Sequence, residues 1–453
     1  MIDDTIAALS TPVGEGGIAI LRISGGDALR IADQLFRDPK GRRLEDAPSH
    51  TIHYGHVMAG DRKIDEVLVS VLRAPRTYTR EDIVEIHCHG GIVAARAVQE
   101  AVLAAGARLA ERGEFTRRAF SNGRISLDQA KAVLDIVRAR TALGLEAAVD
   151  RLGGRFSDAL GALRADLVEI LADLEVEIDY PDLDVELDAI LPRIQACAET
   201  VRRLLSQSES GRLVREGLTI AIVGRPNVGK STLLNALLAE ERAIVTPIPG
   251  TTRDTIEEDA SLDGIPVRWI DTAGLRDADH PIEAEGVRRT RHAMDRADLL
   301  LLLVDRAEPL TEDDERILAA AYGVPTVLVL NKSDLQDRLG APPAGGWRVQ
   351  HEVSAMTGAG IQELKESVLR LMTDGELPTR NSALLLDSWE RDLLRRVSEA
   401  LERASTVEAA LGATPDMVAE ELRVAYTVAG ELQGIDVPES ILDAVFSRFC
   451  VGK

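Results

Sequence analysis

Eight consecutive residues, Gly224 to Ser231, are the strongest candidate for chemistry in this sequence. They read GRPNVGKS and fit the pattern G-x-x-x-x-G-K-[ST], with a strand-like apolar run before them and a helix-like run after them. Glycines in such a loop let backbone N–H groups turn inward around phosphate oxygens. Lys230 is expected to reach the β- and γ-phosphates of a nucleotide, and the Ser231 hydroxyl to bind Mg²⁺. A glycine-rich strand-to-helix turn without a ligand is the alternative, and it leaves the Lys-Ser pair unexplained.

A second motif, DTAG, occupies Asp271–Gly274 at the end of another apolar run. Asp271 is expected to hold Mg²⁺ through a water molecule, and the Gly274 amide to contact the γ-phosphate. Taken alone the motif is weak, because aspartate-rich turns are common. Its position after a buried strand and downstream of the phosphate loop makes it a credible part of the same site.

A third motif, NKSD at Asn331–Asp334, predicts which base is bound. The Asp334 carboxylate can accept hydrogen bonds from both N1–H and the exocyclic amine of guanine, a pair that adenine does not present. Asn331 is expected to support the base and the loop, and the Lys332 stem to cover the purine face. Ser354-Ala355 is expected to supply a backbone N–H to guanine O6. An Asn/Asp turn would explain NKSD alone, but the ordered set predicts a guanine site and resembles the translation-factor-like GTPases.

Catalysis of GTP hydrolysis must differ from the Ras-like arrangement, in which a glutamine directly after DxxG orients the attacking water. Leu275 occupies that position here and cannot do so. The downstream segment offers polar replacements, most of which could equally belong to a solvated acidic loop: Arg276, Asp277, Asp279, His280, Glu283 and Glu285.

Phosphoryl transfer also needs a cation against the developing negative charge. Asn227, together with the loop Thr246–Thr252, resembles GTPases that bind a potassium ion there. Thr252 is expected on Mg²⁺, and the carbonyls of Thr246, Ile248 and Thr251 are expected on K⁺. The prolines in this loop remove N–H groups but no carbonyls, so they permit this; Arg253 is the rival cation. The expected nucleotide contacts also include Val228, Gly229, Thr232, Pro247, Pro249, Gly250, Thr272, Ala273 and Ser333.

Composition limits the remaining possibilities. The 453 residues carry a net charge of −22, so any nucleic-acid partner must be held by a local arginine patch. Three cysteines cannot form a disulfide framework and indicate a reducing, cytoplasmic setting. The start MIDDTIAALS lacks the basic region of a secretory signal, and apolar runs such as Leu299–Val304 are too short to span a bilayer.

The pattern of residues predicts a multidomain α/β protein. Residues 1–118 mix strand-like runs with Gly/Pro turns and one Ala-rich helix near 92–105, as in a small α+β domain. Residues 119–212 and 379–453 show helical periodicity, and residues 213–378 alternate strands with helices, which predicts a parallel sheet. The two helical segments are expected to pack on each other, with the α/β domain inserted between them.

Four further segments extend the argument from one domain to the whole chain. They read DTIAALSTPVGEGGIAILRISG, YTREDIVEIHCHGG, RGEFTRRAFSNGRISLDQAKAV and FSRFCVGK. With the GTTRD and DTAGLR segments of the α/β domain, the sequence resembles the tRNA-modification GTPase MnmE (TrmE) family over essentially its whole length.

That resemblance implies an N-terminal folate-binding and dimerising domain, a helical domain made of two chain segments, and an inserted Ras-like GTPase domain. The implied activity is potassium-dependent GTP hydrolysis (an acid anhydride hydrolase) in a homodimer. With the flavoprotein MnmG, in a heterotetramer, such proteins add an aminomethyl or carboxymethylaminomethyl group to C5 of the wobble uridine of certain tRNAs. The one-carbon unit comes from tetrahydrofolate, bound as the 5-formyl or 5,10-methylene form. No membrane or DNA partner is implied.

The resemblance also assigns residues. The folate contacts would be Arg22, Glu85, Arg124 and Lys453, with Arg124 standing where the family usually has lysine. A carboxylate such as Glu85 suits the amide–amine edge of a pterin, and the cations suit the glutamate tail and formyl oxygen. Glu283 becomes the water-orienting residue. Cys450 is open between a reactive thiol and a small buried apolar residue.

Three other interpretations stay open at this stage. A ribosome-assembly or stress-response G protein would be a binding switch without folate, and a folate enzyme acting on metabolites would not need the GTPase motifs. The sequence His87-Cys88-His89 invites a metal site, although a strand would place only its two histidines on one face. The candidate tRNA contacts are arginines that could also be ordinary solvated residues: Arg112, Arg117, Arg118, Arg124, Arg202 and Arg203.

Replacing Lys230 with alanine tests the first motif. Lys230→Ala removes the positive charge expected against the β- and γ-phosphates. We expect nucleotide affinity to be lost when it is measured by titration with a fluorescent GTP analogue. Tight GTP binding by the folded variant would contradict the assignment.

Overall fold

The structure is a computed structural model that describes residues 4–180, 190–239, 256–271, 293–321, 323–373, 377–379, 382–408 and 414–453. The chain forms two compact units, which are described separately. The first comprises Met1–Leu134, Ser157–Gly161 and Ala429–Lys453, and the second comprises Asp135–Phe156 and Ala162–Val428.

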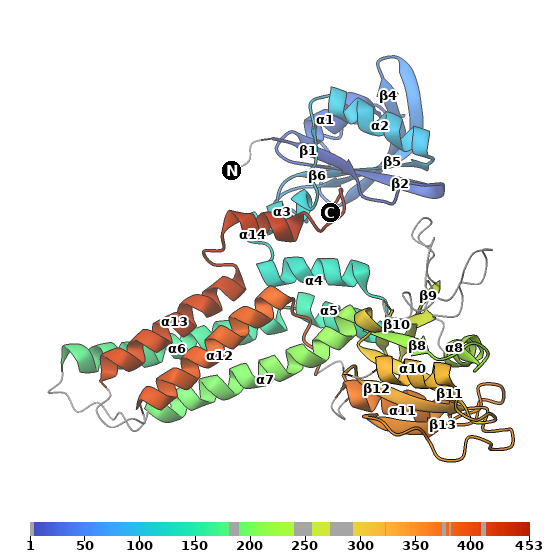
Figure 1. The fold of residues 1–453 in the computed structure, drawn as a ribbon. Helices are drawn as coiled ribbons and strands as arrows, with labels where there is room; N and C mark the ends of the chain where they lie inside the picture. Colours follow the sequence, from blue (N-terminus) through green and yellow to red (C-terminus); the bar gives the residue numbers. More distant parts are fainter. Residues whose placement is uncertain are drawn as a thin grey trace. The chain divides into compact units, whose positions relative to one another are not determined.

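A seven-stranded sheet forms the centre of the first unit (Figure 1), with strand order β3-β4-β5-β6-β2-β1-β7. Only the β1–β7 pair is parallel. The strands are β1 (Ile6–Leu9), β2 (Gly16–Ser24), β3 (Phe36–Arg37), β4 (Thr51–Ala59), β5 (Arg62–Leu72), β6 (Ile83–Gly90) and β7 (Arg108–Leu109).

Two helices, α1 (Ala28–Leu35) and α2 (Ile92–Ala104), supply the apolar residues that pack against this sheet. Along β2 and β6, residues such as Leu21 and Ile86 are buried in that core, whereas Arg22 and Glu85 alternate with them and stay half-buried. This period of two is the pattern of a sheet with one covered face and one open face. The open face of β2 and β6 therefore carries the charged pair that the sequence singled out.

The end of the chain is tied to the first unit. Helices α3 (Glu114–Ser121) and α14 (Glu439–Phe446) precede a C-terminal segment in which Val451 bridges to Arg112. The Gly452 carbonyl accepts a hydrogen bond from Ser10 Oγ at 3.1 Å. A Cβ on Gly452 would lie 2.1 Å from the Leu9 carbonyl, so a side chain could not fit there. Glycine at this position lets the last residues lie against the end of β1.

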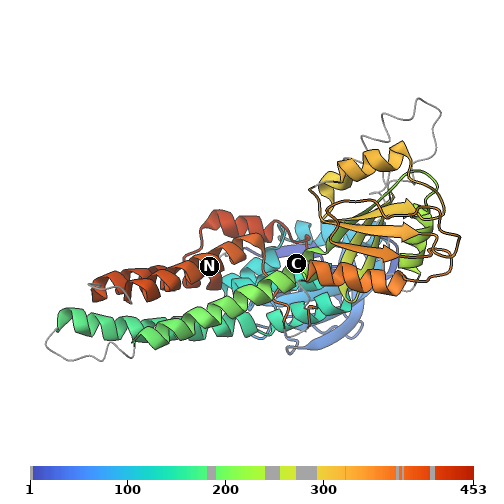
Figure 2. The same cartoon turned by 60° about the horizontal axis from the view of Figure 1, so that its bottom comes forward.

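Long helices make up much of the second unit (Figure 2). They are α4 (Leu127–Arg138), α6 (Arg155–Asp179) and α13 (Pro415–Gln433), which both units share, and α5 (Ala142–Leu152), α7 (Ile190–Glu216) and α12 (Ser388–Glu408). The helices α12 and α7 pack together, although the α/β domain separates them in sequence. Helices α6 and α13 are joined by an Arg423–Glu175 ion pair and by Arg164 over the Tyr426 ring at 4.3 Å. No helix in the described part of the chain is long and apolar enough to cross a membrane.

The segment that follows the α/β domain in sequence is held against α7 by a close backbone contact. Leu384 N–H donates to the Gln207 carbonyl at 2.9 Å, so the segment before α12 lies directly on α7. A Cβ on Gly211 would be 1.9 Å from the Leu384 carbonyl oxygen. Glycine is therefore required at this point of α7 by the approach of a second backbone rather than by a turn.

Buried charges join the same two segments. Arg151 is almost fully buried and forms ion pairs with Asp135 at 3.0 Å and Glu390 at 2.6 Å. Arg215, near the end of α7, pairs with the second oxygen of Asp135 at 3.0 Å. Such a network is satisfied only when all members are in place, and removing one member leaves an uncompensated buried charge.

The α/β domain is built on a six-stranded sheet of order β13-β12-β11-β8-β10-β9, in which only the β10–β9 pair is antiparallel. The strands are β8 (Leu218–Val223), β9 (Ile256–Leu262), β10 (Ile265–Asp271), β11 (Leu299–Asp305), β12 (Thr326–Asn331) and β13 (Val349–Glu352). The predicted parallel sheet is thus confirmed.

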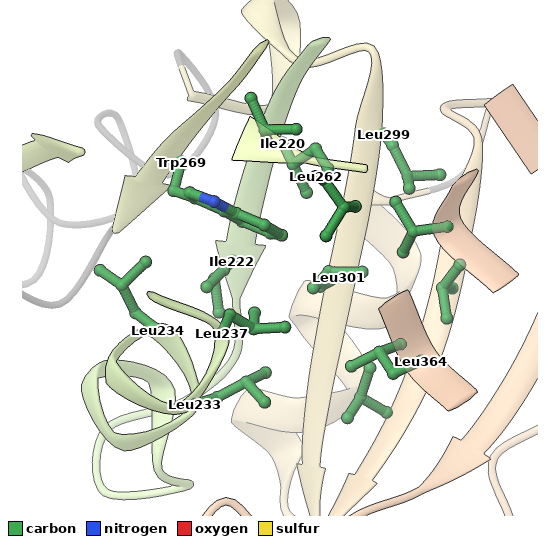
Figure 3. Packing of buried hydrophobic residues seen from close by; sticks show 14 of the residues in the cluster. Ile220, Ile222, Leu233, Leu234, Leu237, Leu262, Trp269, Leu299, Leu301 and Leu364 are labelled. Carbon is green, nitrogen blue, oxygen red and sulfur yellow. The ribbon is translucent and has the colours of Figure 1, made fainter. Parts of the chain in front are cut away.

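Both faces of this sheet are covered, which explains the continuous apolar runs in its strands. Ile220, Ile222, Leu299 and Leu301 pack against α8 (Lys230–Leu238) and α11 (Ile361–Met372), as Figure 3 shows with Trp269 in the same layer. The alternate residues of β8, β11 and β12 pack with residues 293–294 and with α10 (Glu312–Ala320).

A single residue, Gly217, separates α7 from β8. It has φ +79°, its N–H donates to the Leu213 carbonyl at 3.0 Å, and a Cβ would lie 2.5 Å from the Pro266 carbonyl. Glycine thus ends the helix in the left-handed conformation while the neighbouring strand approaches closely.

Two glycine substitutions test the packing of the helical segments. Gly211→Ala must displace the Leu384 backbone, and we expect it to lower the free energy of unfolding by at least about 2 kcal/mol. The matched control is Gly161→Ala in α6, where the nearest atom to a new Cβ is a side-chain nitrogen at 3.6 Å. That change should be neutral or stabilise the helix by about 0.5–1 kcal/mol. Thermal unfolding followed by circular dichroism measures both, and equal effects would argue against the close contact.

Candidate functional site

The phosphate loop connects β8 to α8, as the motif requires. Three of its residues have positive φ, Gly224 at +159°, Asn227 at +67° and Gly229 at +99°. Asparagine tolerates this conformation better than most residues, and Gly229 directly precedes the first turn of α8. A helix N-terminus presents free N–H groups and a positive dipole end, which suits a phosphate.

Lys230 is held within this loop. Its side chain is only 6% exposed, and Nζ donates to the carbonyls of Gly224 at 2.8 Å and Arg225 at 2.9 Å. The ammonium group therefore lies over the loop instead of extending into solvent. Ser231 and Thr232 follow in the first turn of α8 and are exposed.

Asn331 joins the phosphate loop to the expected base-binding loop. Its Nδ2 donates to the Val228 carbonyl at 2.8 Å, and its Oδ1 accepts from the Ala355 N–H at 3.0 Å. A Cβ on Gly229 would lie 2.3 Å from Asn331 Nδ2, so glycine also makes room for this amide. Parallel strands bring such residues together because their carboxyl ends share one edge of the sheet.

Asp305 is a supporting residue that the sequence reasoning missed. It ends β11 opposite Asn331 of β12, is 3% exposed, and pairs with Lys332 Nζ at 2.6 Å. Lys332 has φ +65°, so the backbone turns sharply at this residue while the ion pair fixes its stem. The available signal was a lone aspartate at the end of an apolar strand adjacent to the NKSD strand.

Asp334 and Ser354 are also brought together. Asp334 Oδ1 accepts from Ser354 Oγ at 2.6 Å, and this hydroxyl in turn accepts from the Thr357 N–H at 3.2 Å. The backbone N–H groups expected to reach guanine O6 already have partners, since Ser354 donates to the Ala359 carbonyl and Ala355 to Asn331. Donation to a base by Ala355 would therefore share or replace its bond to Asn331.

Several predicted site residues lie outside the described residues. They are Thr246, Pro247, Ile248, Pro249, Gly250, Thr251, Thr252, Thr272, Ala273, Gly274, Glu283 and the rival cation Arg253. Asp271 is described only by its backbone, at the end of β10 beside Ile222 of β8. Of the predicted metal ligands, the described part of the chain thus contains the side chains of Ser231 and Asn227.

The first unit contains a second group of predicted site residues. Arg22 and Glu85 are directly opposite on β2 and β6, and Arg22 Nε donates to Glu85 Oε1 at 2.8 Å. The Arg22 guanidinium lies 5.7 Å from the centres of both the Tyr78 and Phe115 rings. Arg124 lies 4.8 Å from the centre of the same Tyr78 ring. Tyr78 therefore connects Arg22 and Arg124.

Lys453 follows the Gly452 contact with the end of β1, and Leu9 of β1 pairs with Leu21, the neighbour of Arg22. Cys450 is exposed, so the interpretation of this residue as a small buried apolar side chain is wrong. The C-terminal segment thus places an accessible thiol and the terminal lysine on the first unit.

His87 and His89 have separate partners. His87 Nε2 lies 3.3 Å from Ser70 Oγ, and His89 Nδ1 pairs with Asp65 at 2.7 Å. Cys88 points into the core, and burial raises the pKa of its thiol to about 11. Within the described ranges no cluster of three or more His, Cys, Asp or Glu residues could hold a metal ion.

Two of the candidate RNA-contacting arginines, Arg117 and Arg118, form ion pairs with carboxylates of the first unit. Arg118 is 2% exposed and pairs with Asp4, Glu81 and Glu114. Arg117 pairs with Glu439 and Asp443 of α14. The suggestion that Arg118 contacts RNA is wrong, because its charge is neutralised inside the unit, and Arg117 serves to tie α14 to α3.

Comparison with known proteins gives matches to two family descriptions. Residues 5–124 match "GTP-binding protein TrmE N-terminus" and residues 127–450 match "MnmE helical domain". The chain is 47% identical to the tRNA modification GTPase MnmE of Geobacillus kaustophilus and 43% identical to that of Bacillus subtilis. These alignments cover 99% of this chain in both cases, and 99% and 100% of the relatives. The G domain of the T. maritima FeoB iron transporter is 27% identical, with 34% of this chain and 97% of that chain covered and a TM-score of 0.25.

Asn331→Ala tests the connection between the two loops. The change leaves the Val228 carbonyl and the Ala355 N–H without their partner, at a cost of about 1–3 kcal/mol for each buried group. We expect GTP affinity to fall at least about tenfold, measured by calorimetric titration. The control is Gln362→Ala on α11, whose side chain donates to Glu366 on the same exposed helix face. Unchanged GTP affinity in Asn331→Ala would mean that the bridge does not position the site.

Proposed function

Because this chain belongs to the tRNA modification GTPase MnmE family, we propose that it is a potassium-dependent GTPase that works with the flavoprotein MnmG. The pair would add an aminomethyl or carboxymethylaminomethyl group to C5 of the wobble uridine of certain tRNAs. A tetrahydrofolate one-carbon unit would supply the added carbon. The chain would act in the cytoplasm as a homodimer within a heterotetramer with MnmG.

The observation that carries the nucleotide part is the linkage of Lys230, Asn331 and Asp334 at one edge of the α/β sheet. Lys230 lies over the phosphate loop, and Asn331 ties that loop to the segment containing Ser354 and Ala355. Asp334 is oriented by Ser354 and is suited to the N1–H and amine of guanine. One rigid unit would thus position the phosphates and the base together.

Hydrolysis would proceed by attack of a water molecule on the γ-phosphorus, with cleavage of its bond to the β–γ bridging oxygen. Glu283 would orient the water, and Lys230 would neutralise charge on the β- and γ-phosphates. Mg²⁺ would be held by Ser231 and Thr252, with Asp271 acting through water. A potassium ion at Asn227 and the carbonyls of Thr246, Ile248 and Thr251 would supply the remaining positive charge.

A folate site would be built on the open sheet face of the first unit. Glu85 is held by Arg22 through one oxygen, and its carboxylate would accept hydrogen bonds from the amide–amine edge of a pterin. Arg124, ordered on Tyr78, and the terminal Lys453 would bind the carboxylates or the formyl oxygen. Cys450 is accessible on the same C-terminal segment, and a role for its thiol is part of this proposal.

The decisive experiment is mass spectrometry of wobble uridines from a strain lacking this gene. We expect the C5 modification to be absent, and to be restored by the wild-type gene but not by Lys230→Ala or Glu85→Gln. Normal modification in the deletion strain would refute the function. Calorimetric titration of the purified protein with 5-formyl-tetrahydrofolate tests the folate site separately from the GTPase site. A folded sample that does not bind this folate would refute the folate site and leave the GTPase assignment standing.

Potassium dependence has its own test. We expect faster GTP hydrolysis in KCl than in NaCl at equal ionic strength, because the proposed site selects the larger ion. Asn227→Ala should remove the difference between the two salts. Equal rates for the wild-type protein would instead favour Arg253 as the cation.

A further inference from the structure

An open pocket of about 540 Å³ lies in the first unit, and Arg124, one of the residues proposed for folate, is part of its lining. Its polar lining consists mainly of Arg76, Arg80, Arg124, Tyr78 and His50, and among the described residues no aspartate or glutamate lines it. The three arginines and the histidine are exposed, and Tyr78 is half-buried. In a chain with a net charge of −22 this local excess of positive charge is unusual.

The arginines of this pocket, which we call the arginine pocket, are not neutralised by neighbouring acids. Within the described ranges, none of the three takes part in an ion pair, whereas exposed arginines nearby do, such as Arg30 with Asp27 and Arg42 with Asp38. The acidic residues of the same loop are turned away. Glu81 accepts from Arg118 and from Ser24, and Asp82 accepts from the Ala74 N–H at 2.8 Å.

Backbone carbonyls hold two of the arginines in place. Arg80 Nη1 donates to the Asn122 carbonyl at 2.9 Å, and Arg124 Nη1 donates to the Tyr78 carbonyl at 3.1 Å. A carbonyl orders a guanidinium without cancelling its charge, and the other N–H groups of the fork can still reach an anion. Arg80 has φ +61°, so the loop itself turns at this residue.

Resting on the proposed function in tRNA modification, we propose that the arginine pocket binds phosphodiester groups of the tRNA. An exposed guanidinium gains only about 0–1 kcal/mol from a single carboxylate, which is little for a small ligand. A polyanion also releases condensed counterions when several of its phosphates are contacted, so a cluster of exposed arginines suits a nucleic-acid backbone.

The contact would position the RNA without reading its sequence. The Tyr78 ring has arginines at 4.8 Å and 5.7 Å from its centre, so these guanidiniums compete with a base for the ring. Phosphate contacts of this kind fix the register of a nucleic acid, while base selection must come from other groups. Arg124 lines the arginine pocket and shares the Tyr78 ring with Arg22, so the pocket would hold the tRNA next to the proposed one-carbon site.

The test is tRNA binding by the full-length double variant Arg76→Ala/Arg80→Ala, which leaves the proposed folate contact Arg124 intact. Binding of fluorescently labelled unfractionated tRNA is measured by anisotropy over a series of KCl concentrations. We expect about tenfold weaker binding than for the wild type, and a dependence of log K on log [KCl] that is shallower by about two. The charge-preserving double variant Arg76→Lys/Arg80→Lys should retain most of the affinity.

The matched control is Arg30→Ala/Arg42→Ala, which removes the same charge from the same unit at arginines that pair with aspartates. This control should bind tRNA as the wild type does, and GTP hydrolysis and thermal unfolding should be unchanged in both double variants. Equal loss in the control would reduce the effect to net charge and overturn the proposal. Unchanged tRNA binding in Arg76→Ala/Arg80→Ala, no binding by the wild type at low salt, or a loss confined to 5-formyl-tetrahydrofolate affinity would also overturn it. The last result would assign the pocket to a folate.

Discussion

The two hydrogen bonds of the Asn331 side chain are the interaction on which the nucleotide site depends. They connect the loop that approaches phosphates with the segment that approaches the base, and both bonds are buried. The glycine at position 229 is explained by the same amide, because any side chain there would overlap it. The parallel order of β8, β11 and β12 is what brings these groups to one edge. A nucleotide therefore meets a single preassembled surface rather than two independent loops.

In the first unit, the role of a charged side chain depends on how deeply it is buried and on whether it has an ion-pair partner. Arg118 and Glu114 are buried and paired, and so they stabilise the packing around α3. Arg22 and Glu85 are paired but lie on the open side of the sheet, where a ligand can compete for them. In the arginine pocket, backbone carbonyls order the guanidinium groups, which are exposed and remain accessible to an anion. Arginines of the same unit thus have three roles: Arg118 stabilises the fold, Arg22 is placed to contact a ligand, and those of the arginine pocket are placed to attract an anion.

Much of the α/β fold and of the nucleotide site could be predicted from the sequence, because local apolar runs coincide with buried strands. The runs ending in Val223, Asp305 and Asn331 are mostly apolar, and all three form central strands. The edge strands β9 and β13 escaped prediction because each contains three consecutive polar or charged residues, 257–259 and 350–352, in place of a continuous apolar run. Asp305 and the burial of Arg118 were missed for a related reason: each depends on a partner distant in sequence, which no local pattern reveals.

The junction at Gly217 has a mechanical consequence. A helix of 27 residues is about 40 Å long, and it runs into the strand that ends in the phosphate loop with one residue between them. A tilt of about 5° at that residue moves the distant end of the helix by roughly 3.5 Å, since the arc grows with the helix length. A tilt at Gly217 that is too small to disturb hydrogen bonds around a phosphate would thus shift the distant end of α7 by about the diameter of an atom.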